Sequence, residues 1–216
     1  MPSFYERRIL PRLLTKGCST PPIMRLRAQV VPHAEGRVLE LGIGGGLNLP
    51  FYDPAKVESI AAVDPSAELR ARAVAASRPH NLPLSVCDGT AESLPFDDGS
   101  FDSVVTTFTL CSVDSLAGAL AEARRVLKPG GRLFFCEHGL APDAAVVRWQ
   151  RRVEPLWKCV TGGCHITRPI PAIIAASGFT IEHRESMYMP RTPKITGWTE
   201  WGWAVSSFTR SSAPSS

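Results

Sequence analysis

A glycine cluster follows an acidic residue in the run Glu40-Leu41-Gly42-Ile43-Gly44-Gly45-Gly46. Glycines at such a place let a ligand approach the backbone closely. The cluster lacks the Gly-x-Gly-x-x-Gly spacing of dinucleotide-binding loops, because a leucine takes the place of the third glycine in either register. The carboxylate of Glu40 would also repel a pyrophosphate. It favours a ligand with cationic groups and no phosphate, such as S-adenosylmethionine with its ammonium and sulfonium.

Acidic residues follow the next two apolar runs as well. Asp64 ends the run 59–63, and Asp88 follows the run 84–87. An acid at the end of the second strand accepts hydrogen bonds from ribose hydroxyls in adenosine-binding sites. The segment Asp88-Gly89-Thr90-Ala91-Glu92 stands where an adenine would be read. Each acid alone could serve as a turn or cap residue, but open α/β sheets bind ligands at this shared edge.

Short apolar segments that alternate with helical patterns must position these residues. The sequence predicts helices over 68–77 and 116–127, the second capped by Asp114 or Ser115. Near-continuous apolar strands between helices indicate a parallel sheet that is covered on both faces. The expected strands are residues 37–41, 59–64, 84–87, 103–107 and 133–136.

The two ends of the chain differ from this middle part. Residues 1–36 read as two helices, which Thr20-Pro21-Pro22 separates. Residues 179–183 and 199–205 read as strands without a crossover helix between them, so they must pair antiparallel. We therefore expect an α/β fold, a doubly wound and mostly parallel Rossmann-like sheet with N-terminal helices and a C-terminal antiparallel hairpin. The expected division is 1–36, 37–138, 139–207 and a disordered tail over 208–216.

The composition excludes several classes of protein. The 216-residue chain has 44% hydrophobic and 20% charged residues, which is ordinary for a globular protein. No apolar run reaches the ~18–20 residues that span a bilayer, and the start resembles no secretory signal, so we expect a cytoplasmic protein. The net charge is +4, with an acidic middle between basic ends, unlike the continuous basic face of a nucleic-acid binder. The basic ends could attract an anionic substrate or a membrane surface, which leaves a peripheral membrane contact open.

Six cysteines are spread along the chain without a Cys-x-x-Cys pair. Reduced thiols, and not a disulfide framework, are the default for such a cytosolic protein. Cys159, Cys164 and His165 lie close in sequence, but no second pair completes a tetrahedral site. We therefore expect no metal.

Taken together, the motifs resemble the class I S-adenosylmethionine-dependent methyltransferases. Residues 38–46 resemble the first motif of that family, and Ala62-Val63-Asp64-Pro65-Ser66 resembles the second. The segments 91–96, 98–102 and 125–133 resemble the small-molecule branch that includes the ubiquinone/menaquinone C-methyltransferases. The resemblance implies an enzyme of the Rossmann-like methyltransferase fold with S-adenosyl-L-methionine as its cofactor.

The resemblance also implies a set of cofactor contacts, with one departure from the family pattern. The family commonly has an Asp directly before the Ala-Glu pair, where it meets the adenine amino group, and here Thr90 holds that place. Either Asp88 reaches the adenine, or Thr90 and the backbone near Ala91 read it. The implied cofactor-binding residues are Glu40, Gly42, Gly44, Gly46, Asn48, Asp64, Pro65, Asp88, Thr90, Ala91 and Thr107.

Four segments look closer still to one subgroup, the mammalian alkyl thiol S-methyltransferases. These segments are residues 48–52, 107–113, 136–138 and 163–168. The apolar N-terminal anchor of the mammalian enzymes has no counterpart here, so no integral membrane segment is expected. The subgroup implies a small, largely apolar methyl acceptor with a thiol nucleophile. The implied substrate residues are Phe108, Cys111, His165, Thr167 and Arg168, with a structural role in the loop as the alternative for His165 and Arg168.

His138 is the candidate catalytic base, because it ends the fifth strand at the ligand-binding edge. A thiol with a pKa of ~8.5 is partly ionised at neutral pH, so a strong base is optional for S-methylation. The alternative for His138 is a structural histidine that bonds a loop carbonyl. Two other functions stay open: methylation of a quinone, phenol or phospholipid, and a non-catalytic cofactor- or partner-binding module on the same fold.

Overall fold

The structure is a computed structural model that describes residues 10–207. The expected disordered tail, residues 208–216, lies outside these residues. The strands are β1 (Gly36–Leu41), β2 (Val57–Val63), β3 (Leu84–Cys87), β4 (Phe101–Thr107), β5 (Leu127–His138), β6 (Phe179–Tyr188) and β7 (Trp198–Ser206). The helices are α1 (Leu10–Cys18), α2 (Pro21–Val30), α3 (Ala67–Ser77), α4 (Leu116–Val126), α5 (Ala144–Thr161), α6 (Ile170–Ala176) and α7 (Lys194–Gly197), with short 3₁₀ turns at Val31–His33, Leu49–Phe51 and Arg78–His80.

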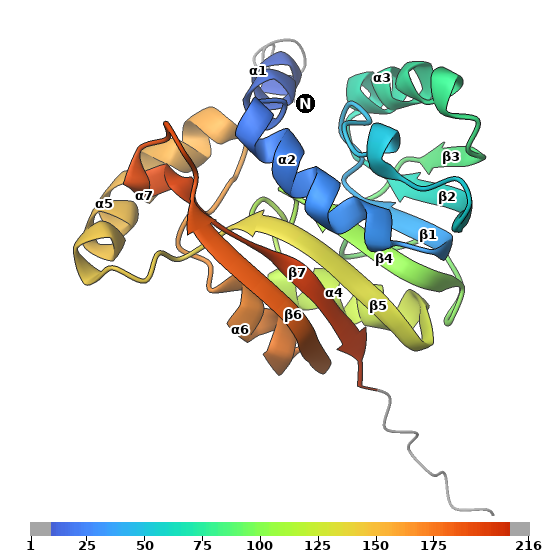
Figure 1. Cartoon of the computed structure of the whole chain (residues 1–216). Helices are drawn as coiled ribbons and strands as arrows, with labels where there is room; N and C mark the ends of the chain where they lie inside the picture. Colours follow the sequence, from blue (N-terminus) through green and yellow to red (C-terminus); the bar gives the residue numbers. More distant parts are fainter. Residues whose placement is uncertain (1–9, 208–216) are drawn as a thin grey trace, which may run out of the picture.

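The strands form one sheet in the order β3-β2-β1-β4-β5-β7-β6 (Figure 1). The five strands from β1 to β5 pair in parallel, and β7 pairs antiparallel with both β5 and β6. The expected doubly wound parallel sheet with an antiparallel C-terminal hairpin is therefore confirmed. The connection between β6 and β7 contains only α7, a single helical turn. Parallel pairing of these two strands would need a much longer crossover connection.

Local signals at the helix ends explain where these elements begin. Ser115 caps α4, because its hydroxyl accepts a hydrogen bond from the Gly118 backbone N–H at 3.1 Å. Ser66 caps α3 in the same way through the Leu69 N–H. Pro21 lies at the first position of α2, where its missing N–H costs no hydrogen bond. The two expected N-terminal helices are α1 and α2.

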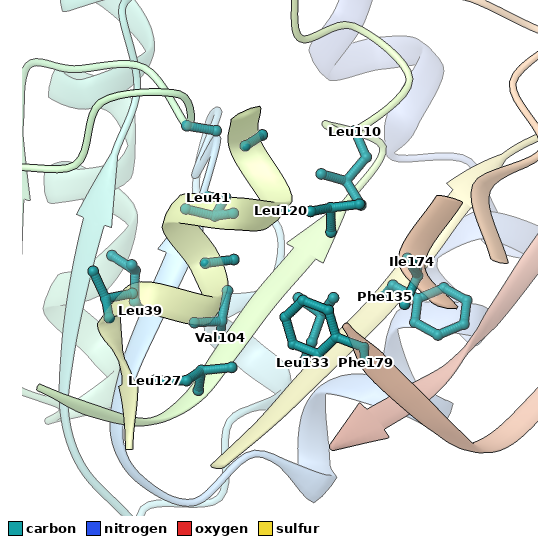
Figure 2. Close-up of a cluster of buried hydrophobic side chains, with 14 of the residues drawn as sticks. Leu39, Leu41, Val104, Leu110, Leu120, Leu127, Leu133, Phe135, Ile174 and Phe179 are labelled. Carbon is teal, nitrogen blue, oxygen red and sulfur yellow. The ribbon is translucent and has the colours of Figure 1, made fainter. Parts of the chain in front are cut away.

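Two hydrophobic cores cover the two faces of the sheet. Strand residues alternate between faces, so Val38 and Val105 contribute to the face under α2, whereas Leu39 and Val104 contribute to the opposite face. Figure 2 shows the second core, where Leu120 of α4 and Ile174 of α6 pack with strand side chains such as Phe135. Both cores anchor the strands firmly and leave their carboxyl ends free to carry loops.

Candidate active site

A cavity of about 380 Å³ opens at the carboxyl ends of β1, β2 and β4. The loops after β1, β2, β3 and β4 line it, and α1, α2 and the end of α5 close it from the other side. The register explains this placement, because Leu41 pairs with Val63 on one side and with Thr106 on the other, so the strands end level. The cavity lies at the edge where open α/β sheets bind their ligands.

The glycine loop after β1 forms the floor of the cavity, and its glycines have different tasks. Gly42 has φ +66°, and a Cβ there would come within 2.5 Å of the Thr109 hydroxyl. Gly44, at φ +54°, has no atom nearer to the place of a Cβ than the Gly42 carbonyl oxygen at 4.0 Å. Both line the cavity, whereas Gly46 packs against Leu49 and α3. The loop thus presents bare backbone to a ligand at Gly44.

Asp64 stands at the end of β2 with its side chain at the cavity wall. Its carboxylate accepts hydrogen bonds from the backbone N–H groups of Gly44, at 2.9 Å, and Ser66, at 2.8 Å. Burial raises the pKa of Asp64, and these two hydrogen bonds oppose the rise. Each oxygen keeps a further lone pair, so Asp64 can still accept hydrogen bonds from hydroxyl groups of a ligand. The neighbouring Pro65 also lines the cavity.

The loop after β3 separates the two candidates for adenine recognition. The Asp88 side chain is 74% exposed, forms a 2.7 Å ion pair with Arg70 and is not part of the cavity wall. Thr90 and Ala91 line the cavity. Glu92, which follows them, accepts hydrogen bonds from the Asp114 and Ser115 N–H groups and so fixes this loop to the start of α4.

A buried polar network lies beneath the glycine loop. Tyr52 donates to one Glu40 oxygen at 2.8 Å, and the Asn48 amide donates to the other at 2.9 Å and to the Thr107 hydroxyl at 3.0 Å. Arg27 of α2 donates to the Asn48 carbonyl oxygen at 2.6 Å and to the Thr107 hydroxyl. Burial raises the pKa of Glu40 to about 7. Thr107 and Arg27 line the cavity, while Glu40 and Asn48 support it from behind.

The loop after β4 holds a strained residue at the cavity wall. Phe108 has φ +56°, a conformation that bulky residues rarely adopt. Its ring lies 5.5 Å from the Arg27 guanidinium and lines the cavity. The buried Glu137 of β5 fixes the loop that follows, because its carboxylate accepts hydrogen bonds from the N–H groups of Thr109, Leu110 and Cys111.

His138, the candidate base, lies behind Phe108 and is not part of the cavity wall. The two ring centroids are 4.9 Å apart in an edge-to-face contact. Burial lowers the pKa of His138 to about 4, so the imidazole is neutral at pH 7. Its buried Nδ1 atom has no hydrogen-bond partner among residues 10–207. The Trp198 backbone nevertheless interacts with the His138 ring and opposes the fall of its pKa, so the structural alternative, a bond to a loop carbonyl, stays a prediction.

The segment after α5 carries three of the predicted substrate residues, and hydrogen bonds tie all three to the protein itself. Glu154 of α5 contacts the His165 ring at 3.1 Å and accepts from the Thr167 N–H at 2.8 Å. Arg168 donates to the carbonyl oxygens of Leu110 and Val113 at 2.6 and 2.7 Å. These three side chains are not part of the cavity wall, which the segment reaches only through Gly162.

Cys111, another predicted substrate residue, also lies away from the cavity. It is buried in a small cluster with Cys164 and Ile166. All six cysteines of the chain are free thiols.

Helix α1 supplies a cavity wall that the sequence did not predict. Leu10, Thr15 and Cys18 line the cavity from this helix, together with Phe108 and Val113 from the other side. Leu10 packs directly on Gly162, where a Cβ would lie 2.6 Å from a Leu10 methyl group. The cavity thus has an apolar part next to the polar glycine loop.

The family comparison agrees with this geometry. The family model described as a methyltransferase domain matches residues 39–135. Residues 39–135 are therefore similar to a methyltransferase domain, and a solved putative methyltransferase shares the fold. The match begins in β1 and ends in β5, so the matched segment contains the glycine loop, Asp64, Thr90 and Thr107.

Known relatives and structures resemble the methyltransferase domain and its surroundings. The thiol S-methyltransferase TMT1B of Rattus norvegicus is 39% identical over 138 residues, which cover 62% of this chain and 56% of the rat protein. The demethylmenaquinone methyltransferase of Thermus thermophilus is 28% identical over 194 residues, which cover 81% of this chain and 88% of that protein. A solved putative methyltransferase from Bacillus halodurans shares the fold, with a TM-score of 0.68 at 17% identity over 84% of this chain and 97% of that chain.

The chain spans little more than half the length of the rat and human TMT1B proteins that it matches. Among its helices within residues 10–207, none is both long enough and apolar enough to cross a bilayer.

The cavity fits S-adenosylmethionine, the cofactor that the sequence resemblance implies. Gly44 leaves room for a ligand beside the backbone, and Asp64 offers free lone pairs for ribose hydroxyls. Arg27 contributes a cation at the same wall, and its buried Nε atom lacks a partner among the described residues. Such an orphaned donor next to a cavity indicates a ligand that completes its hydrogen bonding.

Proposed function

We propose that the protein transfers the methyl group of S-adenosylmethionine to the thiol of a small, largely apolar acceptor. The observation that carries this proposal is the mixed wall of the cavity. The glycine loop and Asp64 form its polar part, and Leu10, Phe108 and Val113 form an apolar part in the same cavity. A cofactor and an apolar acceptor can therefore meet in one enclosed space.

The predicted cofactor contacts divide into two groups in this proposal. Gly42, Gly44, Asp64, Pro65 and Thr107 would contact the cofactor from the cavity wall. The position of Thr90 and Ala91 at the wall favours them over the solvent-exposed Asp88 for reading the adenine. Glu40, Gly46 and Asn48 would act indirectly, because they hold the loop and Thr107 in place.

The chemistry asks the protein mainly to align the reacting atoms. When bound, S-adenosylmethionine supplies a methyl group on a sulfonium sulfur; transfer forms the acceptor S–C bond, breaks the sulfonium C–S bond and leaves S-adenosylhomocysteine. Holding two reactants in line can lower a barrier by about 7–11 kcal/mol. Phe108 would hold the acceptor against the glycine loop. Its strained backbone is fixed because the next residue, Thr109, donates its N–H to the Glu137 carboxylate.

A thiol acceptor suits a site without a strong base. His138 has a pKa of about 4 and lies behind Phe108, so it is a weak base for a thiol of pKa ~8.5. Solution ionisation already supplies some thiolate at neutral pH. The match to the rat thiol S-methyltransferase supports the same acceptor class.

A quinone or phenol acceptor is the second candidate. It is favoured by the match to the Thermus demethylmenaquinone methyltransferase, which covers 88% of that protein. The apolar wall of Leu10, Phe108 and Val113 would suit a quinone ring as well. We further infer a cytoplasmic protein whose thiols stay reduced, and we propose no nucleic-acid partner.

A methyl-transfer screen tests the proposal. The purified protein is incubated with radiolabelled S-adenosylmethionine and a panel of alkyl and aryl thiols, phenols, quinones and phospholipid vesicles. We expect label on thiols, and much less label in parallel reactions with Asp64→Ala at the same low cofactor concentration. If quinones, phenols or phospholipids are methylated and thiols are not, the thiol acceptor is contradicted and the methyltransferase assignment stands. Cofactor binding in calorimetry without transfer to any acceptor would favour a non-catalytic module.

A further inference from the structure

Exposed apolar side chains gather on two neighbouring helices, α1 and α5. Within residues 10–207, the large hydrophobic side chains that are exposed are Leu13, Val74, Trp149, Leu156 and Val160. All of them except Val74 lie on α1 or α5. The two helices are neighbours, because Leu10 of α1 packs on Gly162, directly after α5. Apolar side chains that gather in this way mark an interaction site, whereas a single exposed one does not.

The apolar side chains of α5 form one stripe along the helix. Trp149 and Leu156 are separated by about two helical turns, so they lie on the same face. The Trp149 residue is 53% exposed, and Leu156 is 71% exposed. The Arg152 guanidinium lies 5.3 Å from the centre of the Trp149 ring. The helix therefore presents an aromatic ring, a cation and a leucine side chain together to the solvent.

The charges exposed on these two helices are all positive. The exposed cations are Arg12, Lys16, Arg148, Arg151 and Arg152. None of the five forms an ion pair within residues 10–207. The acidic residue of α5, Glu154, turns inward to the His165 ring and the Thr167 N–H. Asp143, which precedes the helix, accepts a hydrogen bond from the Tyr188 hydroxyl. The cations and the apolar stripe together are called the α1/α5 surface below.

The composition of the α1/α5 surface selects one kind of partner. Helices that lie in a membrane interface combine arginine or lysine with exposed tryptophan and leucine. A second copy of the chain is disfavoured, because a two-fold interface would place the same cations against each other. A nucleic-acid backbone would pair with the cations but would gain nothing from the exposed Leu156 side chain.

We propose that the α1/α5 surface docks on an anionic lipid bilayer. Trp149 and Leu156 enter the headgroup region, and the five cations lie against the negative headgroups. This inference goes beyond the proposed function and does not depend on it. Docking would bring the cavity close to the membrane, because Leu10 and Gly162, at the junction of the two helices, also line the cavity. An apolar methyl acceptor that partitions into lipid would then have a short path to the cavity.

Co-sedimentation with lipid vesicles tests the proposal on the full chain, without cofactor or acceptor. The vesicles consist of phosphatidylcholine alone or of equal parts of phosphatidylcholine and phosphatidylglycerol. We expect the wild type to bind the anionic vesicles about 100-fold more tightly, and to lose this preference as salt screens the charges. The combined variant Arg148→Gln/Arg151→Gln/Arg152→Gln should lose about 100-fold in affinity for anionic vesicles, at about fivefold for each cation. Trp149→Ser/Leu156→Ser should lose about tenfold or more.

Matched controls separate this surface from general charge and hydrophobicity. Arg37→Gln/Lys56→Gln/Arg78→Gln removes three exposed cations near the opposite edge of the sheet. Val74→Ser removes an exposed apolar side chain from α3. Both controls should bind anionic vesicles within about threefold of the wild type, because their sites lie away from the docked face. Circular dichroism and thermal unfolding show whether each variant is folded, and the single substitutions carry the test where a combined variant is not.

The proposal is overturned if the wild type binds neither kind of vesicle, or if the substitutions on α5 leave its affinity for anionic vesicles unchanged. Binding of labelled duplex DNA without vesicle binding would overturn it in favour of a nucleic acid. A dimer in sedimentation velocity that Trp149→Ser/Leu156→Ser dissociates, without vesicle binding, would overturn it in favour of a second copy. Inert thiols in the transfer screen leave the inference intact, because vesicle binding is measured without an acceptor.

Discussion

Glu40 carries a carboxyl group whose pKa is shifted in opposite directions by its surroundings. Burial raises the pKa from 4.5 to about 7, against the hydrogen bonds from Tyr52 and Asn48 and the charge of Arg27. The folded state thus holds a proton that the unfolded chain releases above pH 4.5. Stability from this group is complete below pH 4.5 and is lost as the pH rises through 7, by on the order of 3 kcal/mol.

Denaturant unfolding at several pH values measures this effect. Glu40→Gln has no ionisable group at this position. We therefore expect the free energy of unfolding of the wild type to fall, relative to that of Glu40→Gln, as the pH rises from 5 to 8. Other titrating groups are common to both proteins, so they cancel in the difference. A difference that stays constant over this range would show that Glu40 is ionised throughout.

His138 gives a second prediction that depends on pH. With a pKa of about 4 it is neutral at pH 7, yet it has little driving force to take a proton from a thiol. With a thiol acceptor, His138→Ala should therefore lose less than about tenfold in kcat/KM once the pH exceeds the thiol pKa of ~8.5. Rates of methyl transfer from pH 6 to 9.5 check this. A loss of ~10²–10⁴-fold that persists at high pH would make His138 a general base.

Asp64 is the residue whose loss should most directly weaken cofactor binding. Asp64→Ala removes the proposed charged acceptor for ribose hydroxyls, and we expect a loss of ~1.5–3 kcal/mol, or about 10- to 100-fold in Kd. Calorimetry with S-adenosylmethionine measures this change. Asp88→Ala is the matched control, because Asp88 is an exposed acid one strand away, and its affinity should stay within about twofold of the wild type. Equal affinities in all three proteins would exclude Asp64 from the site.

The sequence predicted the cavity residues that directly follow a strand. It missed the cavity residues that only tertiary contacts bring to the site. Gly42, Gly44 and Asp64 follow strands directly, so the sheet brings them to one edge. Arg27 is one of several arginines near the N-terminus, and nothing in its local sequence separates it from an exposed one. Glu137 lies in a recognised motif, but its three hydrogen bonds to the loop after β4 depend on the way that loop folds back.

At the scale of elements, Arg168 joins the segment after α5 to the loop after β4. Its guanidinium donates to the carbonyl oxygens of Leu110 and Val113. Arg168→Lys retains the charge but cannot reach both carbonyls in the same geometry, so one acceptor loses its donor. We expect a loss of about 1–3 kcal/mol in the free energy of unfolding, measured with denaturant. Arg151→Lys, on the exposed face of α5, should change stability by less than about 0.5 kcal/mol.

Helix α5 is an element that the sequence pattern failed to predict. The apolar side chains of α5 do not mark a buried face, because Trp149 and Leu156 are exposed and Gln150 is fully buried. Gln150 instead holds the helix to the preceding loop through the Ala141 N–H and the Gly139 carbonyl. Pro155 inside the helix also argued against a long helical element. A helix that is held by polar contacts shows no helical spacing of apolar residues, so the sequence pattern cannot predict it.

At the scale of the molecule, the cavity should exclude nicotinamide dinucleotides. The glycine loop lacks the third glycine of the dinucleotide fingerprint, and a carboxyl group, Glu40, lies directly beneath it. We expect no binding of NAD or NADP up to millimolar concentration in a fluorescence titration, with S-adenosylhomocysteine as the positive control. Micromolar affinity for either dinucleotide would contradict the cofactor assignment.

The order and direction of the strands were the most predictable property of the molecule. Alternating apolar strands and helices specify parallel pairing, and the absence of a long connection before β7 specifies the antiparallel pair. The strand ends were less predictable, because β5 begins at Leu127, directly after α4, and not at 133. A register shift between Phe101 and Ser103 accommodates this early pairing of β5 with β4, and it has no sequence signal.

The antiparallel direction of β7 has a practical consequence for attaching the protein to a surface. Thr199 at its start pairs with His138 at the edge that carries the cavity, and Val205 near its end pairs with Arg132 at the opposite edge. A linker joined after Ser207 therefore leaves the sheet on the side away from the cavity. Immobilisation through this end should keep the cavity open to ligands on a biosensor chip, whereas a linker on α1 would stand at its mouth.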